Sequence, residues 1–283
     1  MKKIIIVTAF FLTGGYLSAQ DATDAQDAIH EYSIFGGGGL SALRYSPTVG
    51  SQRGSFGGEF GLGYTYSRKQ WGPWGIHAGA GVSLYGAKAT INNQPERFIT
   101  EHLIDNEGDI FEMRTLLSNY EEKHTALILH IPVMGRYAHN QFFGMLGFKF
   151  GIPLSGKFST SGSSTLSNHA YYPDYHNTLT SQTFAGFGDF QDYTSKGSHD
   201  FGMSIALALE GGMKWNIGDN LLLYAGLYFD IGLNDVARGG NFHYVDYEAG
   251  VPASFSTNSI LSALDEKAGV IAAGVKLRLA LRR

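Results

Sequence analysis

Apolar and polar residues alternate with a period of two along much of the chain, and residues 201–233 show this most clearly. Along 203–215 most alternate positions carry large apolar side chains, and along 221–233 the pattern repeats. The two arms are joined by Gly218 to Asn220, whose residue types favour tight turns. A period of two predicts β-strands, so this segment predicts a β-hairpin.

The polarity of the two faces indicates where these strands lie. One face is apolar throughout, while the other carries small residues, tyrosines and isolated charges. Each arm runs to about 13 residues, whereas a strand in a soluble protein usually has about five or six. Long strands with one continuous apolar face are typical of a transmembrane β-barrel, in which apolar side chains point outward and polar ones inward.

The same alternation predicts an all-β fold, an eight-stranded antiparallel transmembrane up-and-down β-barrel. The predicted strands are residues 32–43, 55–67, 74–88, 125–137, 142–154, 201–215, 221–233 and 268–281. Connections after the second, fourth and sixth strands are short, and three of the others are long and polar. In bacterial barrels short turns are periplasmic and long loops extracellular, so we expect both termini in the periplasm.

Two local features refine this prediction. Pro132 lies inside the fourth strand and has no N–H to donate to a neighbour, so we expect a β-bulge there. The third long loop, from Asn234 to about Glu266, is expected to hold a short helix near Asn258 to Lys267.

The first residues predict a targeting segment. Met1 is followed by two basic residues, Lys2 and Lys3, and residues 4–12 are apolar. Leu17-Ser18-Ala19 before Gln20 has the small residues of a signal-peptide cleavage site. We interpret residues 1–19 as a signal peptide, 20–30 as a periplasmic lead and 31–283 as the outer-membrane barrel. The absence of cysteine excludes disulfide scaffolds and Cys-ligated metal sites.

Charge and glycine content narrow the choice of ligand. Removing the signal peptide leaves 19 basic against 25 acidic residues, a net charge of −6, which argues against nucleic acid as a partner. Glycine accounts for 38 of 283 residues, about twice the usual ~7%, and we expect it to make room for bulky neighbours in a narrow barrel. The run Gly36 to Gly39 lacks the Lys-Ser/Thr and the helix of a phosphate-binding loop. We therefore expect no nucleotide or other cofactor.

Charged residues recur at inward-facing positions of the predicted strands. The interior of an eight-stranded barrel is just wide enough for side chains to fill, and charges in so dry a space must pair. We interpret them as a structural salt-bridge network that closes the lumen; the alternative is a gated ion or proton path. The predicted network comprises Glu59, Arg136, Lys149, Glu210, Lys214, Asp230, Lys276 and Arg278, with His77, His130, Tyr224 and Tyr228 beside it.

Aromatic residues gather at the short-turn end of the predicted strands. Such residues form girdles at the boundary between membrane and water. The predicted girdle consists of Tyr66, Trp71, Trp74, Tyr137, Phe142 and Trp215.

The long loops carry residue types that are used in catalysis and in binding. Their histidines and acids include His169, His176, Asp174, Asp200, His243 and Asp246, but no spacing singles out a set. We therefore assign no catalytic residue and no metal ligand, and the chain is more readily interpreted as a binding protein than as an enzyme. Loop tyrosines beside serine and asparagine suit adaptable contacts with a partner.

One short motif resembles a known family. The segment His130-Ile-Pro-Val-Met-Gly-Arg-Tyr137 resembles a strand of the small outer-membrane β-barrel proteins of Bacteroidota, described as PorT-like, in which Ile-Pro precedes three apolar or small residues and Lys/Arg-Tyr. Ser18-Ala19-Gln20 is similar to signal-peptide junctions of that phylum. The resemblance implies an outer-membrane barrel domain, with a part in protein secretion or gliding in some members.

These patterns predict a monomeric protein of the bacterial outer membrane that serves as an anchor or binding scaffold. We expect outer-membrane lipid and lipopolysaccharide around the barrel, and a protein or glycan partner at the extracellular loops. Three alternatives stay open: an outer-membrane lipid-modifying enzyme that performs acyl transfer or hydrolysis at the barrel rim, a small gated channel, and a soluble periplasmic barrel.

Overall fold

The computed structural model describes residues 27–44, 50–92, 94–160, 164–198, 200–237, 243–263 and 267–283. The expected signal peptide, and the part of the expected lead before Asp27, lie outside the described residues. Among the residues described, no helix is long and apolar enough to cross a membrane.

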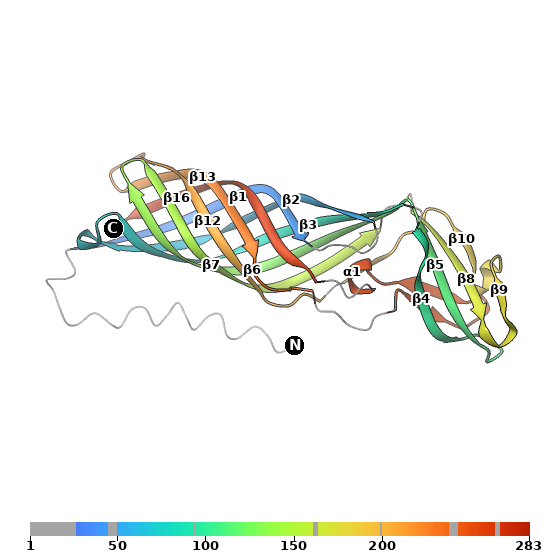
Figure 1. Ribbon diagram of the computed structural model, residues 1–283. Coiled ribbons are helices and arrows are strands. Elements are labelled where there is room, and N and C mark those ends of the chain that lie inside the picture. Colours follow the sequence, from blue (N-terminus) through green and yellow to red (C-terminus); the bar gives the residue numbers. More distant parts are fainter. Residues whose placement is uncertain are drawn as a thin grey trace.

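Eight long strands form a closed antiparallel ring (Figure 1). Each strand pairs with the next barrel strand along the chain, and the last pairs with the first, in register from Glu31–Arg282 to Arg44–Gly269. The ring consists of β1 (Ala28–Arg44), β2 (Ser51–Arg68), β3 (Trp74–Ile91), β6 (Tyr120–His139), β7 (Phe142–Thr160), β12 (Ser204–Asn216), β13 (Leu221–Gly232) and β16 (Gly269–Arg282). The prediction of an all-β, eight-stranded up-and-down barrel is confirmed.

The two faces of the barrel wall differ as the alternation predicts. Leu227 on β13 is 67% exposed, whereas its neighbours Tyr228 and Asp230 point inward and are buried. On β16, Leu277 is exposed while Lys276 and Arg278 are buried. Apolar side chains therefore cover the outside of the barrel and charged ones fill the inside.

Glycines on the barrel wall lie where interior side chains need room. A Cβ atom on Gly61 would lie 2.6 Å from the ring of Phe35, and one on Gly81 would lie 2.9 Å from Nε2 of His130. Neither distance is compatible with a side chain, so these glycines let large inward-facing groups fit into a ring of only eight strands.

The prediction of a β-bulge at Pro132 is wrong. Pro132 stays in register with Lys149 on β7, and the register shift between β6 and β7 lies between Leu127 and Ile128. Toward β3, the pairing is interrupted between Val133 and His130 without a change of register. The missing N–H of proline is accommodated by this local gap in the ladder, so no extra residue is needed.

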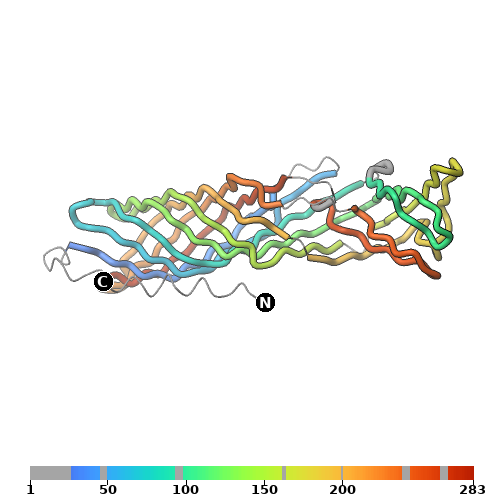
Figure 2. Tube along the Cα trace, turned by 90° about the horizontal axis from the view of Figure 1, so that it is seen from below, coloured from blue at the N-terminus to red at the C-terminus, as the bar shows by residue number. Residues whose placement is uncertain are grey.

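The connections at the end opposite the start of β1 and the C-terminus fold into a second all-β body, which we call the head (Figures 1 and 2). Its main sheet has the order β10-β8-β5-β4, with β9 added to β8, and a separate hairpin joins β14 to β15. The head strands are β4 (Gln94–Ile104), β5 (Ile110–Ser118), β8 (Thr165–Tyr172), β9 (Asn177–Leu179), β10 (Gly188–Phe190), β14 (Val245–Glu248) and β15 (Ser254–Thr257). The long polar loops expected after three of the barrel strands are therefore largely folded.

An apolar core holds the head together. Phe111 and Met113 on β5 are fully buried, and the ring of Phe111 lies 5.2 Å from that of Tyr247 on the β14–β15 hairpin. Phe190 and Phe255 make a second edge-to-face contact at 4.8 Å. Because all three long connections contribute to this core, the main sheet and the hairpin form one unit.

The short elements complete the chain. The turn between β2 and β3 contains the 3-10 helix η4 (Lys69–Trp71), and the head contains η5 (Pro173–Tyr175) and η6 (Thr183–Ala185). β11 (Lys196–Ser198) adds to β7 beyond the ring. The short helix α1 (Ile260–Ala263) lies within the segment where a helix was expected.

Candidate functional site

A network of buried charges crosses the middle of the barrel. The ammonium group of Lys149 donates to Glu59 at 2.9 Å and to Asp230 at 2.6 Å. Lys276 lies between Glu59 and Glu210, and Arg278 donates to Glu210 at 2.7 Å. Three acids thus balance three bases that come from β2, β7, β12, β13 and β16.

Burial explains why these charges are paired. All six side chains of this central network are nearly inaccessible to solvent. Transfer of an unpaired charge into such an environment costs several kcal/mol, so each group requires its partners. The contacts join strands on opposite sides of the ring and therefore fix the lumen in a closed form.

A second charged cluster, around Glu31, lies nearer the end of the barrel where β1 starts and β16 ends. Its carboxylate accepts hydrogen bonds from the Tyr224 hydroxyl at 2.8 Å and from Arg282 at 3.0 Å, and Arg136 lies 3.4 Å away. Arg136 also donates to the Tyr224 hydroxyl at 2.7 Å. Arg136, expected in the interior, is buried there, whereas sequence reasoning did not include Glu31 and Arg282. The signal was present, because Glu31 is in phase with the inward-facing Ser33 on the same strand.

Lys214 lies outside both charged clusters. Its side chain is half-buried near the turn between β12 and β13, where it faces Tyr224 in the strand register. Within the described part of the chain, no salt bridge joins Lys214 to an acid.

Ser83, His130 and Glu59 have the order of a catalytic triad but occupy a sealed position. The Ser83 hydroxyl lies 2.9 Å from Nδ1 of His130, whose Nε2 is 3.7 Å from Glu59. The adjoining cavity has a volume of about 10 Å³, which is room for roughly one water molecule. No substrate reaches this serine, so we interpret the contacts as structural.

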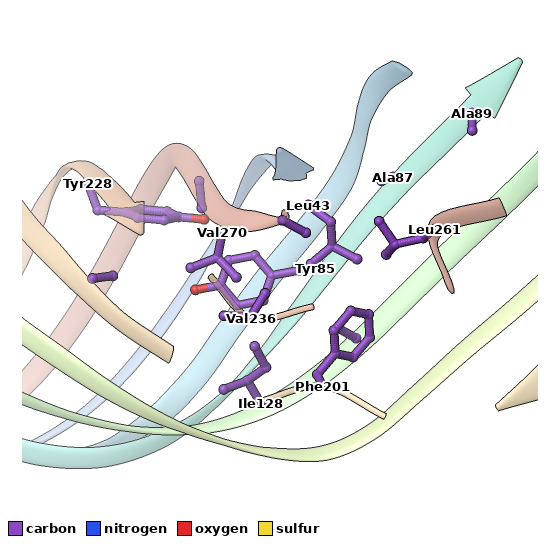
Figure 3. Close-up of a cluster of buried hydrophobic side chains, with 14 residues drawn as sticks. Leu43, Tyr85, Ala87, Ala89, Ile128, Phe201, Tyr228, Val236, Leu261 and Val270 are labelled. Atoms are coloured by element: carbon purple, nitrogen blue, oxygen red, sulfur yellow. The ribbon is translucent and has the colours of Figure 1, made fainter. Parts of the chain in front are cut away.

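Between the charged network and the head, an apolar layer closes the other half of the lumen (Figure 3). Tyr85 and Ile128 contribute to it from the barrel wall. Phe201, Val236 and Leu261 reach it from the connecting segments and are each at most 5% exposed. The barrel is therefore closed by charges in its middle and by apolar side chains toward the head.

Glu122 fastens one connecting segment to the barrel. Its carboxylate is fully buried and accepts hydrogen bonds from Tyr120 at 2.8 Å and from Ser259 at 2.7 Å. The backbone N–H of Ile260, at the start of α1, donates to it at 3.2 Å. These bonds hold the segment that carries Leu261 over the opening of the barrel.

The six residues of the predicted aromatic girdle lie at the end of the barrel where β1 starts and β16 ends. Trp71 and Tyr66 contact edge to face with ring centroids 5.5 Å apart, and Trp74 and Tyr137 do so at 5.0 Å. Phe142, at the start of β7, is 66% exposed, and Trp215 is exposed near the end of β12. The structure thus brings the girdle residues to one level of the barrel surface.

The head contains a pocket of about 320 Å³ between the β4–β5 turn, η5, η6 and β14. Aromatic side chains form much of its lining: Tyr172, Tyr175, Phe184, Phe187 and Tyr247. Leu179 and Ala185 also line it, and the remaining lining residues are polar or acidic: Asp105, Asn106, Glu107, Asp109, Asn177 and Gln182. Sequence reasoning missed this pocket because its residues come from three connections whose relative placement no local pattern shows.

Hydrogen bonds shape the acidic side of the pocket. Asp105 Oδ1 accepts the backbone N–H groups of Glu107 and Asp109, both at 2.9 Å, and Oδ2 accepts the Tyr172 hydroxyl at 2.9 Å. Partial burial alone would raise the pKa of Asp105, but these hydrogen bonds outweigh it and hold the pKa below its ordinary value. Asp109 accepts the Tyr175 hydroxyl at 3.2 Å. The turn is therefore an ordered, negatively charged wall.

The loop histidines and acids considered for catalysis are spread over the head and its base. His169 lies on β8, His176 follows η5, and His243 precedes β14. Asp246 accepts a hydrogen bond from Asn258 at 2.9 Å, which fastens the β14–β15 hairpin. Within the described ranges, no three His, Asp or Glu side chains are grouped to hold a metal ion.

Comparison with solved structures finds other outer-membrane barrels. A major outer membrane protein from Thermus thermophilus is 12% identical over 90% of this chain and 99% of that one, with a TM-score of 0.35. OprG from Pseudomonas aeruginosa is 12% identical over 91% and 95%, with a TM-score of 0.33. Ail of Yersinia pestis, solved in complex with the heparin analogue sucrose octasulfate, is 12% identical over 88% and 98%, with a TM-score of 0.28. At these identities and scores, no role is taken from the three proteins.

A wider comparison gives the family. No curated protein sequence matches the chain. The profile of the family described as "Outer membrane protein beta-barrel domain" matches residues 19–238, well over half of the chain. Together with the closed eight-stranded ring and its apolar exterior, this match shows that the chain belongs to the outer membrane protein β-barrel domain family.

Proposed function

We propose that this protein is an outer-membrane anchor that holds a binding head at the cell surface. One observation carries the proposal: the three long connections leave the barrel at the same end and fold around a common apolar core. A chain that only had to span the membrane would not need this second core. The head also holds a pocket of a size typical of ligand sites.

The orientation of the barrel is part of the proposal. The short turns, the aromatic girdle, the start of β1 and the C-terminus share one end, which is the periplasmic end in barrels of this kind. The head then faces outward, and the apolar wall contacts membrane lipid, with lipopolysaccharide in the outer leaflet. We infer a monomer because the ring is closed and offers no free strand edge within the membrane.

The closed lumen favours an anchor over a gated channel. The two cavities that the charged network lines have volumes of about 10 Å³ each. Neither is larger than the room needed for about one water molecule. Above them lies the apolar layer, whose members Phe201, Val236 and Leu261 are buried.

The finer family resemblance is also a proposal. We propose that the protein is a PorT-like barrel of Bacteroidota, because the segment His130 to Tyr137 resembles that family and its residues His130 and Arg136 are buried in the barrel interior. Its support is the segment's resemblance together with the inward direction of these two side chains.

Single cysteines test the orientation, because the natural chain has none. Glu107→Cys lies in the exposed β4–β5 turn of the head, and Asp219→Cys lies in the exposed turn between β12 and β13. In intact cells, a membrane-impermeant maleimide should label the first variant and not the second. Labelling of both should follow permeabilisation of the outer membrane. The reverse pattern in intact cells would overturn the proposed orientation.

Conductance measurements test the anchor against the channel. Folded protein in planar bilayers should give no reproducible single-channel conductance. A matched preparation of Glu210→Ala, which removes a central partner of Lys276 and Arg278, shows whether opening the network alone creates a path. Steady conductance by the natural chain would replace the anchor with a channel.

A further inference from the structure

The head pocket combines aromatic walls with an unbalanced negative charge. Three of its lining residues, Asp105, Glu107 and Asp109, are acidic, and no lysine, arginine or histidine of the described head lines it. The nearest base on β5, Arg114, pairs with Glu112 at 3.2 Å and lies 4.1 Å over the ring of Tyr171. That arginine therefore does not neutralise the pocket.

The aromatic side chains are placed to receive a ligand. Phe184 and Tyr175 line the pocket and are 65% and 63% exposed, so two large rings are open to solvent there. Behind them, Tyr172 and Phe187 are buried and form a fixed floor. The rings of Tyr172 and Tyr175 lie 6.3 Å apart at 47° to one another, which leaves their faces at different angles around the cavity.

We propose that this pocket binds an organic cation, a guanidinium or ammonium group carried by a basic side chain or a small amine. Such a group is attracted by the faces of aromatic rings and by nearby carboxylates. The inference rests on the proposed function in one respect, that the head is a binding module. It adds the class of ligand and the residues that select it.

The geometry assigns different tasks to the two sides of the pocket. Asp105 accepts hydrogen bonds from the turn and from the Tyr172 hydroxyl, and Asp109 accepts one from the Tyr175 hydroxyl. Both carboxylates therefore hold the wall in place and also add negative charge. Glu107 is exposed in the turn, and its carboxylate makes no hydrogen bond or salt bridge to the described part of the head. It is the carboxylate available to the incoming cation. A neutral saccharide also stacks on aromatic rings but gains nothing from the net charge.

The test uses the full-length folded protein in detergent and three probes followed by NMR saturation transfer and calorimetry. The probes are Nα-acetylarginine methylamide, its neutral citrulline analogue, and a disaccharide of N-acetylglucosamine. The arginine probe should bind about tenfold more tightly than the citrulline probe, the advantage expected of one desolvated cation–π contact together with a nearby carboxylate. Its affinity should fall as salt is added.

Two matched pairs of variants locate the binding. Glu107→Gln should weaken the arginine probe several-fold, whereas Glu101→Gln, an exposed acid on β4 outside the pocket, should not. Phe184→Ala should weaken it similarly, whereas Val251→Ala, an exposed apolar residue outside the pocket, should not. All four positions are exposed, so the head is expected to fold normally in each variant.

Three results would overturn the inference: equal affinity for the arginine and citrulline probes, binding of the disaccharide in place of the cation, or no binding of any probe by folded protein. None of these would affect the cysteine labelling or the conductance result. Failure of the anchor proposal would instead appear as a protected head cysteine in intact cells or as steady conductance.

Discussion

The barrel and the head use the same alternation of residues with opposite results. On β13 of the barrel, Leu227 faces outward and Asp230 is buried. On β5 of the head, Phe111 and Met113 are buried, and the side chains between them, such as Glu112, reach the surface. The period of two is identical in both regions, so it shows that a strand is present but not which face is dry.

The environment of each region explains the inversion. Lipid surrounds the barrel wall and rewards apolar side chains outside, so charges must be paired within. Water surrounds the head, so apolar side chains gather inside as in a soluble protein. β6 passes from one region to the other: Tyr120 at its start belongs to the apolar core of the head, while Arg136 near its end belongs to the charged interior. Polar substitutions should therefore have different costs in the two regions.

Loss of one acid from the barrel interior should have the largest effect. Glu210→Ala leaves Lys276 and Arg278 buried without a main partner, and breaking a buried pair in this way costs about 3–5 kcal/mol. Urea unfolding in lipid vesicles, followed by the gel shift between folded and boiled protein, measures the change. Asp27→Asn, which breaks the exposed pair with Lys69, is the matched control and should cost no more than about 1 kcal/mol. Equal costs would show that the interior is wet.

Loss of one ring from the head core should act on the head alone. Phe111→Ala removes a fully buried ring and should destabilise the head by about 3–5 kcal/mol. Protease applied to the outside of intact cells should then cut the head, while the barrel keeps its gel shift. Phe184→Ala, which removes a ring that is 65% exposed, should leave the head resistant. If Phe111→Ala abolished the gel shift as well, the two regions would be a single folding unit.

An arginine on the exposed surface should separate the regions by their solvent. Leu227→Arg places a charge on the lipid-facing wall and should cost about 2–4 kcal/mol near the middle of the membrane. Val251→Arg, at a residue that is 87% exposed in the head, should be close to neutral. The comparison uses the same unfolding measurement for both variants. A neutral Leu227→Arg would place that face of the barrel in water.

The barrel was predictable from the sequence because its signal is local. Each strand can be recognised from its own alternation of apolar and polar residues, and the inward direction of Glu210 or Lys276 follows from the apolar residues beside it. The pairing of Lys276 with both Glu59 and Glu210 did not follow, because it depends on which residues face one another across the ring. Glu31 was missed because the first strand begins before the boundary drawn from the pattern.

The head was not predictable for the opposite reason. Phe111 and Met113 alternate with the charged residues Glu112 and Arg114 only over a short stretch. The β4–β5 hairpin that carries them buries its apolar face against β8 and the β14–β15 hairpin. Those partners follow far along the chain. A short amphipathic strand within a polar segment is easily taken for a loop. The pocket depends on the same long-range packing, so its residues gave no joint signal.

Protonation of the acidic wall of the pocket should have the smallest effect on stability, and this pH dependence should distinguish the head from the barrel. Hydrogen bonds from the Glu107 and Asp109 N–H groups and from Tyr172 outweigh partial burial and hold the pKa of Asp105 below its ordinary value in the folded head. A carboxyl whose pKa is lowered by folding stabilises the fold at pH above its ordinary value. That contribution is lost as the pH falls through the lowered pKa.

Thermal unfolding of the head, followed by near-ultraviolet circular dichroism of its tyrosines between pH 7 and pH 3, measures this contribution. The melting temperature should fall slightly toward the acid end, and Asp105→Asn should remove part of that dependence because the amide does not titrate. Asp174→Asn is the control, since it removes an exposed charge next to Tyr175 without touching the turn. If both variants changed the pH profile equally, net charge and not the hydrogen-bonded turn would govern the stability of the head. If only Asp105→Asn did so, the wall that faces the proposed cation is held by its own carboxylate, and a ligand that binds there should raise the melting temperature most at neutral pH.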